Sequence, residues 1–161
     1  MNNLFITAWI AAGGWVVAII SLVQGFLERK GAREEERLGK TLDYFDGGSQ
    51  RRSIGISMIE GLWLNKPKYR DIIVPLISNQ VVYLLLCTES KDAHNERNLV
   101  RMVMILMRIP DFKNKYHDRW GDVSNAIYAK FQGEEKGISM PGPTLQLWYS
   151  GLGNENPLEH E

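Results

Sequence analysis

Apolar and polar residues are strongly segregated at the start of the chain. The first 27 residues carry no charged side chain, and residues 4–27 read LFITAWIAAGGWVVAIISLVQGFL. A helix of that length would be about 36 Å long, enough to cross a hydrocarbon core of roughly 30 Å. A cleaved signal peptide would carry Lys or Arg before a shorter apolar core, whereas Asn2 and Asn3 are uncharged. The pattern therefore predicts a transmembrane anchor over residues 1–27.

Small residues recur along one face of this predicted span. At 100° per residue they fall within about 80° of arc, whereas bulky residues such as Trp9 and Val16 lie opposite. Helices in a bilayer pack closely where small side chains let the backbones approach, and the period of about 3.5 residues specifies a left-handed supercoil. The predicted packing stripe, which favours a homo-oligomer or another membrane partner, consists of Thr7, Ala11, Gly14, Ala18, Ser21 and Gly25.

A charged segment, residues 28–48, follows the span and predicts a juxtamembrane helix or connector that ends at Gly47-Gly48. Its basic residues favour a cytoplasmic location for residues 28–161, with the N-terminus outside the cell (inner) membrane. Three arginines spaced by four residues point to contact with anionic lipid, but Glu34, Glu35 and Glu36 interleave and favour a solvated, salt-bridged face. The basic residues are Arg29, Lys30, Arg33, Arg37 and Lys40.

Residues 49–132 contain successive helical patterns separated by turns. Apolar faces are expected over 49–64, 68–88, 95–109 and 111–131. Pro75, Ser78, Asn79 and Gln80 interrupt the apolar run in 68–88, which favours a buried core helix over a second span. No alternating strand pattern is present, so the sequence predicts an all-α cytoplasmic domain, either a helical bundle or a short HEAT-like helical stack.

In three of these segments, the spacing predicts which residues lie on the apolar face of the helix and which lie away from it. In 49–64, Ile54, Met58, Ile59, Leu62 and Trp63 are expected on the apolar face, beside a small-residue edge of Ser53, Ser57 and Gly61. In 95–109, the arginines at 97, 101 and 108 are expected to face solvent or a partner. In 111–131, one helix is expected to direct Asn125 and Lys130 away from its apolar side.

Residues 133–161 form a tail rich in Gly and Pro, which is incompatible with one continuing helix. An apolar island, LQLWYSGL, occupies residues 145–152 within it. Such an island either docks on its own domain or binds a partner as a linear motif. The partner-binding candidates are Leu145, Leu147, Trp148 and Tyr149.

Composition narrows the possible chemistry. The chain of 161 residues has 19 basic and 19 acidic residues, so no DNA or RNA partner is expected. Its single cysteine, Cys87, lies in an apolar run that favours a buried thiol. His117 and Asp118, with Asp111 and Asp122 nearby, lack the spacing of a metal hydrolase. With no nucleotide-binding or nucleophile motif, the sequence predicts neither a metal, a cofactor nor an enzyme.

A glycine turn before a helix is the strongest ligand-binding candidate. The backbone N–H groups at a helix N-terminus and two neighbouring arginine side chains together suit an anion, such as a phosphate or a nucleotide. A simple connector with solvated arginines is the alternative. The candidate residues are Gly47, Gly48, Ser49, Gln50, Arg51 and Arg52, with Ser49 expected to cap the helix.

One span followed by a small domain resembles, in layout, small bacterial membrane effectors in antiviral defence. The first hypothesis is therefore a non-enzymatic effector or assembly protein that self-associates through its span and senses a protein partner or an anionic ligand. The alternative is a membrane-tethered adaptor, in which the span only localises a domain that binds a protein partner.

Overall fold

The computed structural model describes residues 24–89 and 92–154, and every regular element in these ranges is helical. The predicted all-α class is therefore confirmed for this part of the chain. The chain divides into two units between Leu42 and Asp43. Each unit is described by itself.

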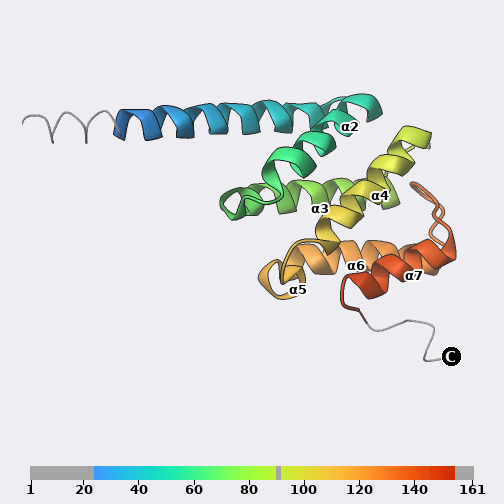
Figure 1. Cartoon of the computed structure of the whole chain (residues 1–161). Helices are drawn as coiled ribbons and strands as arrows, with labels where there is room; N and C mark the ends of the chain where they lie inside the picture. The colour runs from blue at the N-terminus through green and yellow to red at the C-terminus, as the bar shows by residue number, and fades with distance from the viewer. Residues whose placement is uncertain (1–23, 90–91, 155–161) are drawn as a thin grey trace, which may run out of the picture. The chain divides into compact units, whose positions relative to one another are not determined.

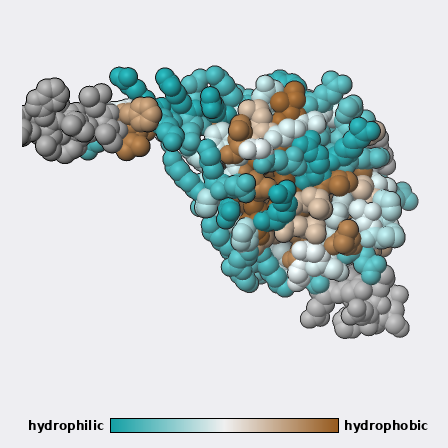
Figure 2. All heavy atoms as spheres, viewed as in Figure 1, coloured by the Kyte–Doolittle hydropathy of each residue, from teal (hydrophilic) through white to brown (hydrophobic). Residues whose placement is uncertain are grey.

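The described part of the first unit, residues 24–42, is one long helix that extends one residue past the unit boundary to residue 43. It carries the charged segment that the sequence predicted to be a juxtamembrane helix. Phe26 and Leu27 near its beginning are 69% and 59% exposed. Figure 2 shows apolar side chains near the beginning of this helix and mainly hydrophilic ones farther along it.

The predicted span, residues 4–27, lies outside the described residues apart from its last four. Among the residues that the structure describes, no helix combines the length and the hydropathy needed to cross a membrane. Of the predicted packing stripe only Gly25 is described. A Cβ added there would meet nothing within 4 Å.

The second unit starts with a short 3₁₀ turn, η1 (Tyr44–Asp46), and the helix α2 (Ser49–Met58), which continues as a π-helical segment η2 (Ile59–Trp63). A further 3₁₀ turn, η3 (Pro67–Tyr69), leads into α3 (Arg70–Leu86). The remaining helices are α4 (Ala93–Met107), α5 (Phe112–Lys115), α6 (His117–Phe131) and α7 (Gly142–Gly151).

Helix α3 is at the centre of this unit, with α4 and α6 packed against it (Figure 1). At 100° per residue its buried residues fall within about 140° of arc, and they include Ile73, Val74, Ile77, Val81, Leu84 and Leu85. This broad buried face confirms the prediction of a core helix, although Ile72 and Tyr83 on the other side are 48% and 46% exposed. Helix α2 packs against α4, and α7 packs against α6 and α4.

The buried face of α2 and η2 agrees only in part with the predicted one, because Ile59 and Trp63 are buried as expected but other residues are not. Ile54 and Leu62 are each 48% exposed, whereas Arg52, Gly55 and Ile56 are buried. A Cβ at Gly55 would lie 2.7 Å from the Phe45 ring, so close packing on η1 requires a glycine there. The helix is therefore rotated toward a side that hydropathy alone would expose.

The predicted helix over 111–131 is broken in two at Tyr116, where φ is −126° and ψ is 47°. Val123 and Ile127 are buried, and Asn125 is exposed as expected. The expectation for Lys130 was wrong, because its side chain is buried at the end of α6. Its Nζ donates to the carbonyl oxygens of Glu134 (2.7 Å) and Lys136 (2.8 Å) and so stabilises the turn into the tail.

The tail is anchored to the end of α3. The Ile138 N–H donates to the Leu84 carbonyl oxygen at 2.9 Å, and the Ile138 side chain is buried. Gly137 has φ +72°, and an added Cβ would lie 2.1 Å from the Leu85 carbonyl oxygen. Only glycine suits this close approach. The tail then forms α7, which holds the apolar island.

Candidate functional site

The N-terminus of α2 carries the predicted anion-binding residues. Gly48, in an extended conformation, is the N-cap, and Ser49 is the first helical residue, so the expectation that Ser49 caps the helix was wrong. No side chain caps this end of the helix. Gln50 and Arg51 are exposed there. This end of α2 therefore presents backbone N–H groups and one exposed guanidinium.

The two arginines of this segment point to different surroundings. The Arg51 guanidinium lies 5.6 Å from the centre of the Tyr44 ring, and the Arg51 side chain passes so close to Gly47 that a Cβ there would lie 2.6 Å from Cδ. The Arg52 side chain is buried instead, and its Nη1 donates to Asn95 Oδ1 at 2.7 Å. The structure does not bring the two guanidinium groups together as one ligand-binding pair.

Arg52 has an unusual environment for a cation. Burial lowers its pKa, and electrostatic interaction with Tyr83 and Asp92 acts in the opposite direction. Asp92 caps α4 by accepting from the Asn95 N–H at 2.8 Å, so Asn95 links the cap to the guanidinium. The buried Nε of Arg52 has no hydrogen-bond partner among the described residues. We interpret Arg52 as part of the α2–α4 interface.

That interface continues as a row of polar contacts. Asn98 Nδ2 donates to the Ser49 carbonyl oxygen at 2.7 Å. Arg101 donates to Ser57 Oγ at 2.8 Å and forms an ion pair of 2.5 Å with Glu60. From the sequence, Arg101 was expected to face solvent or a partner. Its contacts between α2 and α4 were not predicted. The available signal was the small-residue edge of α2, since serines spaced by four leave room for a long side chain.

The candidate partner-binding segment lies in α7 and is divided by the fold. Leu145 and Trp148 are 3% and 1% exposed, so they belong to the core. Tyr149 is partly buried and packs edge-on to Phe131, with ring centres 6.1 Å apart. Leu147 is 62% exposed. The Trp120 Nε1–H donates to the Leu152 carbonyl oxygen at 2.8 Å, which fixes the end of the helix. The apolar island is therefore docked on its own domain. Of the four partner-binding candidates, Leu147 alone has a largely exposed side chain.

A polar hollow of about 380 Å³ lies between α3 and the start of α6, where the sequence drew attention to His117 and Asp118. Tyr116 Oη donates to Asp71 Oδ1 at 2.6 Å, and Lys115 Nζ lies 3.3 Å from the same oxygen. The hydrogen bond from Tyr116, and next that from Lys115, hold the pKa of Asp71 below its ordinary value. Among the described residues, no group of three or more His, Cys, Asp and Glu side chains is placed to hold a metal ion.

Cys87 is at the C-terminal end of α3, and its side chain is exposed. The expectation of a buried thiol was wrong, because the apolar run of α3 ends one residue earlier and the chain turns toward the surface.

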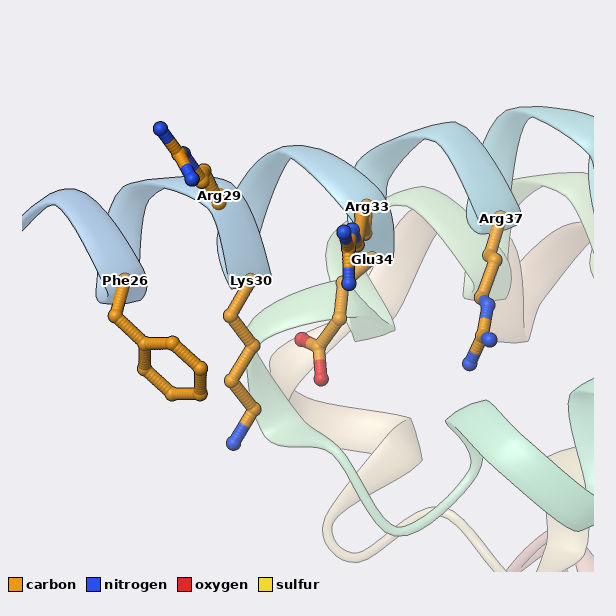
Figure 3. Close-up of a pocket in the computed structure, with 6 residues that line it drawn as sticks. All are labelled: Phe26, Arg29, Lys30, Arg33, Glu34 and Arg37. Carbon is orange, nitrogen blue, oxygen red and sulfur yellow. The ribbon is translucent and has the colours of Figure 1, made fainter.

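The helix over residues 24–43 carries a second charged surface. An open hollow of about 420 Å³ runs along it, lined by Phe26, Arg29, Lys30, Arg33, Glu34 and Arg37. Figure 3 shows Phe26, Lys30 and Arg37 projecting from one side of the helix, with Arg29 at the opposite edge. Lys40 is paired with Glu36 at 2.6 Å, one turn apart, which lowers the pKa of Glu36.

The chain shows no match to any protein-family model, and neither a curated protein nor a solved structure is significantly similar to it. Its function is therefore argued from the placement of its own residues.

Proposed function

We propose that this chain is a single-pass, non-enzymatic membrane effector. Residues 4–27 anchor it, the small-residue stripe drives self-association, and the helical domain binds a protein partner or an anionic ligand on the cytoplasmic side. The observation that carries this proposal is the sharp change at residue 28. An uncharged apolar segment long enough to span a bilayer leads directly into a charged helix.

The described helix supports this organisation. It includes the last residues of the apolar segment and continues to residue 43 without a break. Phe26 and Leu27, at its beginning, are exposed in the isolated chain. Large apolar side chains in such a position are expected to lie at or within a membrane.

Self-association is tested by the mass of the full-length protein in mild detergent, measured by light scattering. Gly14→Leu places a bulky side chain in the stripe, and we expect it to dissociate the wild-type oligomer. Val16→Leu, on the opposite face of the predicted span, is the matched control and should leave the mass unchanged. A wild-type monomer, or an oligomer unaffected by Gly14→Leu, would contradict the proposed assembly.

The adaptor remains a second candidate, favoured by apolar side chains that the domain leaves exposed. Val100 and Met104, four residues apart on α4, are 37% and 45% exposed, and Leu147 on α7 is more exposed than either. An adaptor needs its span only for localisation. It should therefore function with residues 4–27 replaced by an unrelated single span, whereas an effector that works through the stripe should lose activity on the same replacement.

A further inference from the structure

The basic side chains of the helix over residues 24–43 gather on one face. The segment contains five basic and five acidic residues. At 100° per residue, all five basic residues fall within about 100° of arc, and Phe26 lies inside that arc. Four of the five acidic residues fall in a separate arc of similar width. The linear sequence interleaves the charges, but the helix separates them with the exception of Glu34, which lines the same hollow as Arg29, Lys30 and Arg33.

Three of these cations are available for a ligand. Arg29, Lys30 and Arg33 form no ion pair among the described residues, and all three are exposed. Lys40 is paired with Glu36, and Arg37 also interacts with the Glu36 carboxylate. The free positive charge is therefore concentrated at the beginning of the helix, beside the exposed Phe26 and Leu27.

The distance of these cations from the predicted span suits a lipid headgroup layer. With a rise of 1.5 Å per residue, Arg29 and Arg33 lie about 3 and 9 Å beyond Leu27 along the helix axis. The headgroup layer extends roughly 5–8 Å from the hydrocarbon core, and a long basic side chain spans the remaining distance. Arg37 and Lys40 lie about 15 and 20 Å beyond Leu27, outside that layer.

We propose that Arg29, Lys30 and Arg33 form a binding site for the headgroups of anionic phospholipids. The inference rests on the proposed function, because it takes residues 4–27 as the span. Charge complementarity and the neighbouring exposed apolar residues favour a lipid surface over an acidic protein, which would not require the cations to follow directly after the apolar segment.

The test measures lipid selectivity of the full-length protein reconstituted into phosphatidylcholine vesicles. Spin-labelled phosphatidylglycerol and phosphatidylcholine are compared by the fraction of each that the protein immobilises. We expect a preference for phosphatidylglycerol of at least about threefold, reduced by 0.5 M salt. The triple variant Arg29→Gln/Lys30→Gln/Arg33→Gln should lose it. The double variant Arg37→Gln/Lys40→Gln is the matched control and should retain it.

Alkaline extraction of the same vesicles separates the two possible failures. A wild-type chain that is washed off is not inserted, which overturns the proposed function. A chain that stays inserted but shows no preference, or a triple variant as selective as the wild type, overturns the lipid site alone and turns attention to an acidic protein partner. Equal losses in the triple and double variants would also overturn it, because they would indicate a general charge effect.

Discussion

Gly137 holds the tail against the end of α3, and its backbone conformation is open only to glycine. A left-handed conformation costs a residue with a Cβ about 1–2 kcal/mol. At this position the Cβ would also overlap the Leu85 carbonyl oxygen. We therefore expect Gly137→Ala to lower the free energy of unfolding by more than about 2 kcal/mol, measured by urea titration with circular dichroism.

Gly133 provides the matched control. Its φ is +88°, but a Cβ there would meet nothing within 4 Å. Gly133→Ala should therefore cost only the conformational term, about 1 kcal/mol. Equal effects of the two substitutions would mean that the close approach of Gly137 to Leu85 does not exist in solution.

The hydrogen bonds of Asp71 predict how their contribution to stability depends on pH. Its hydrogen bonds lower the pKa below the ordinary 3.8, so the folded state binds the proton less well than the unfolded chain. The stabilisation is thus present above pH 3.8 and is lost as the pH falls through the lower folded-state pKa. A carboxyl titration by NMR should show that Tyr116→Phe raises the pKa of Asp71 more than Lys115→Gln does. An unchanged pKa in both variants would contradict the contacts seen here.

At the scale of elements, hydropathy located the helices better than their faces. The helical segments 49–64, 68–88 and 95–109 were predictable because apolar residues recur at helical spacing and Gly or Pro marks their ends. The buried side of α2 was not predictable, because it depends on Arg52 and Gly55, which hydropathy scores as surface or turn residues. Asn95, which makes the burial of Arg52 possible, lies 43 residues away. Long-range polar pairing of this kind leaves no periodic signal.

The same pairing predicts a stability effect between α2 and α4. Asn95→Ala removes the acceptor of the buried Arg52 guanidinium, and the loss of a hydrogen bond to a charged group should cost about 1.5–3 kcal/mol. Asn125→Ala, at an exposed position on α6, should stay within about 0.5 kcal/mol of wild type. Urea denaturation measures both. Adding Arg52→Met to Asn95→Ala should recover part of the loss, and a further loss instead would show that Arg52 is stabilised by other contacts.

Helix α7 shows why the tail was ambiguous from the sequence. A short apolar island reads the same whether it meets its own domain or a partner, and only the packing on α6 decides. Trp148→Ala should therefore destabilise the protein by about 3–5 kcal/mol, as for other buried aromatic residues. Leu147→Ala, the neighbouring exposed position, should change stability by less than about 0.5 kcal/mol. Thermal and urea unfolding test the pair, and a small effect of Trp148→Ala would indicate that the island is not docked in solution.

At the scale of the whole molecule, the unit boundary lies between Leu42 and Asp43, and it does not coincide with any predicted domain boundary. The predicted helical domain began at residue 49. The structure adds η1, whose Phe45 is 3% exposed and packs on Gly55. An amphipathic pattern cannot reveal this addition, because a 3₁₀ turn of three residues is too short to show a period.

The boundary predicts that residues 43–161 fold on their own. Every element from η1 to α7 lies within this fragment, and so does the apolar core around α3. We expect the fragment to be helical by circular dichroism and to unfold in a single cooperative urea transition, because it retains the packing that stabilises α3. A fragment starting at residue 49 is the matched control. Without Phe45 it should be less stable by about 3–5 kcal/mol, the cost of removing a buried phenylalanine. A fragment of residues 43–161 that binds hydrophobic dyes and lacks a cooperative transition would show instead that the domain depends on the preceding helix, and the two units would then have to be treated as one folding unit.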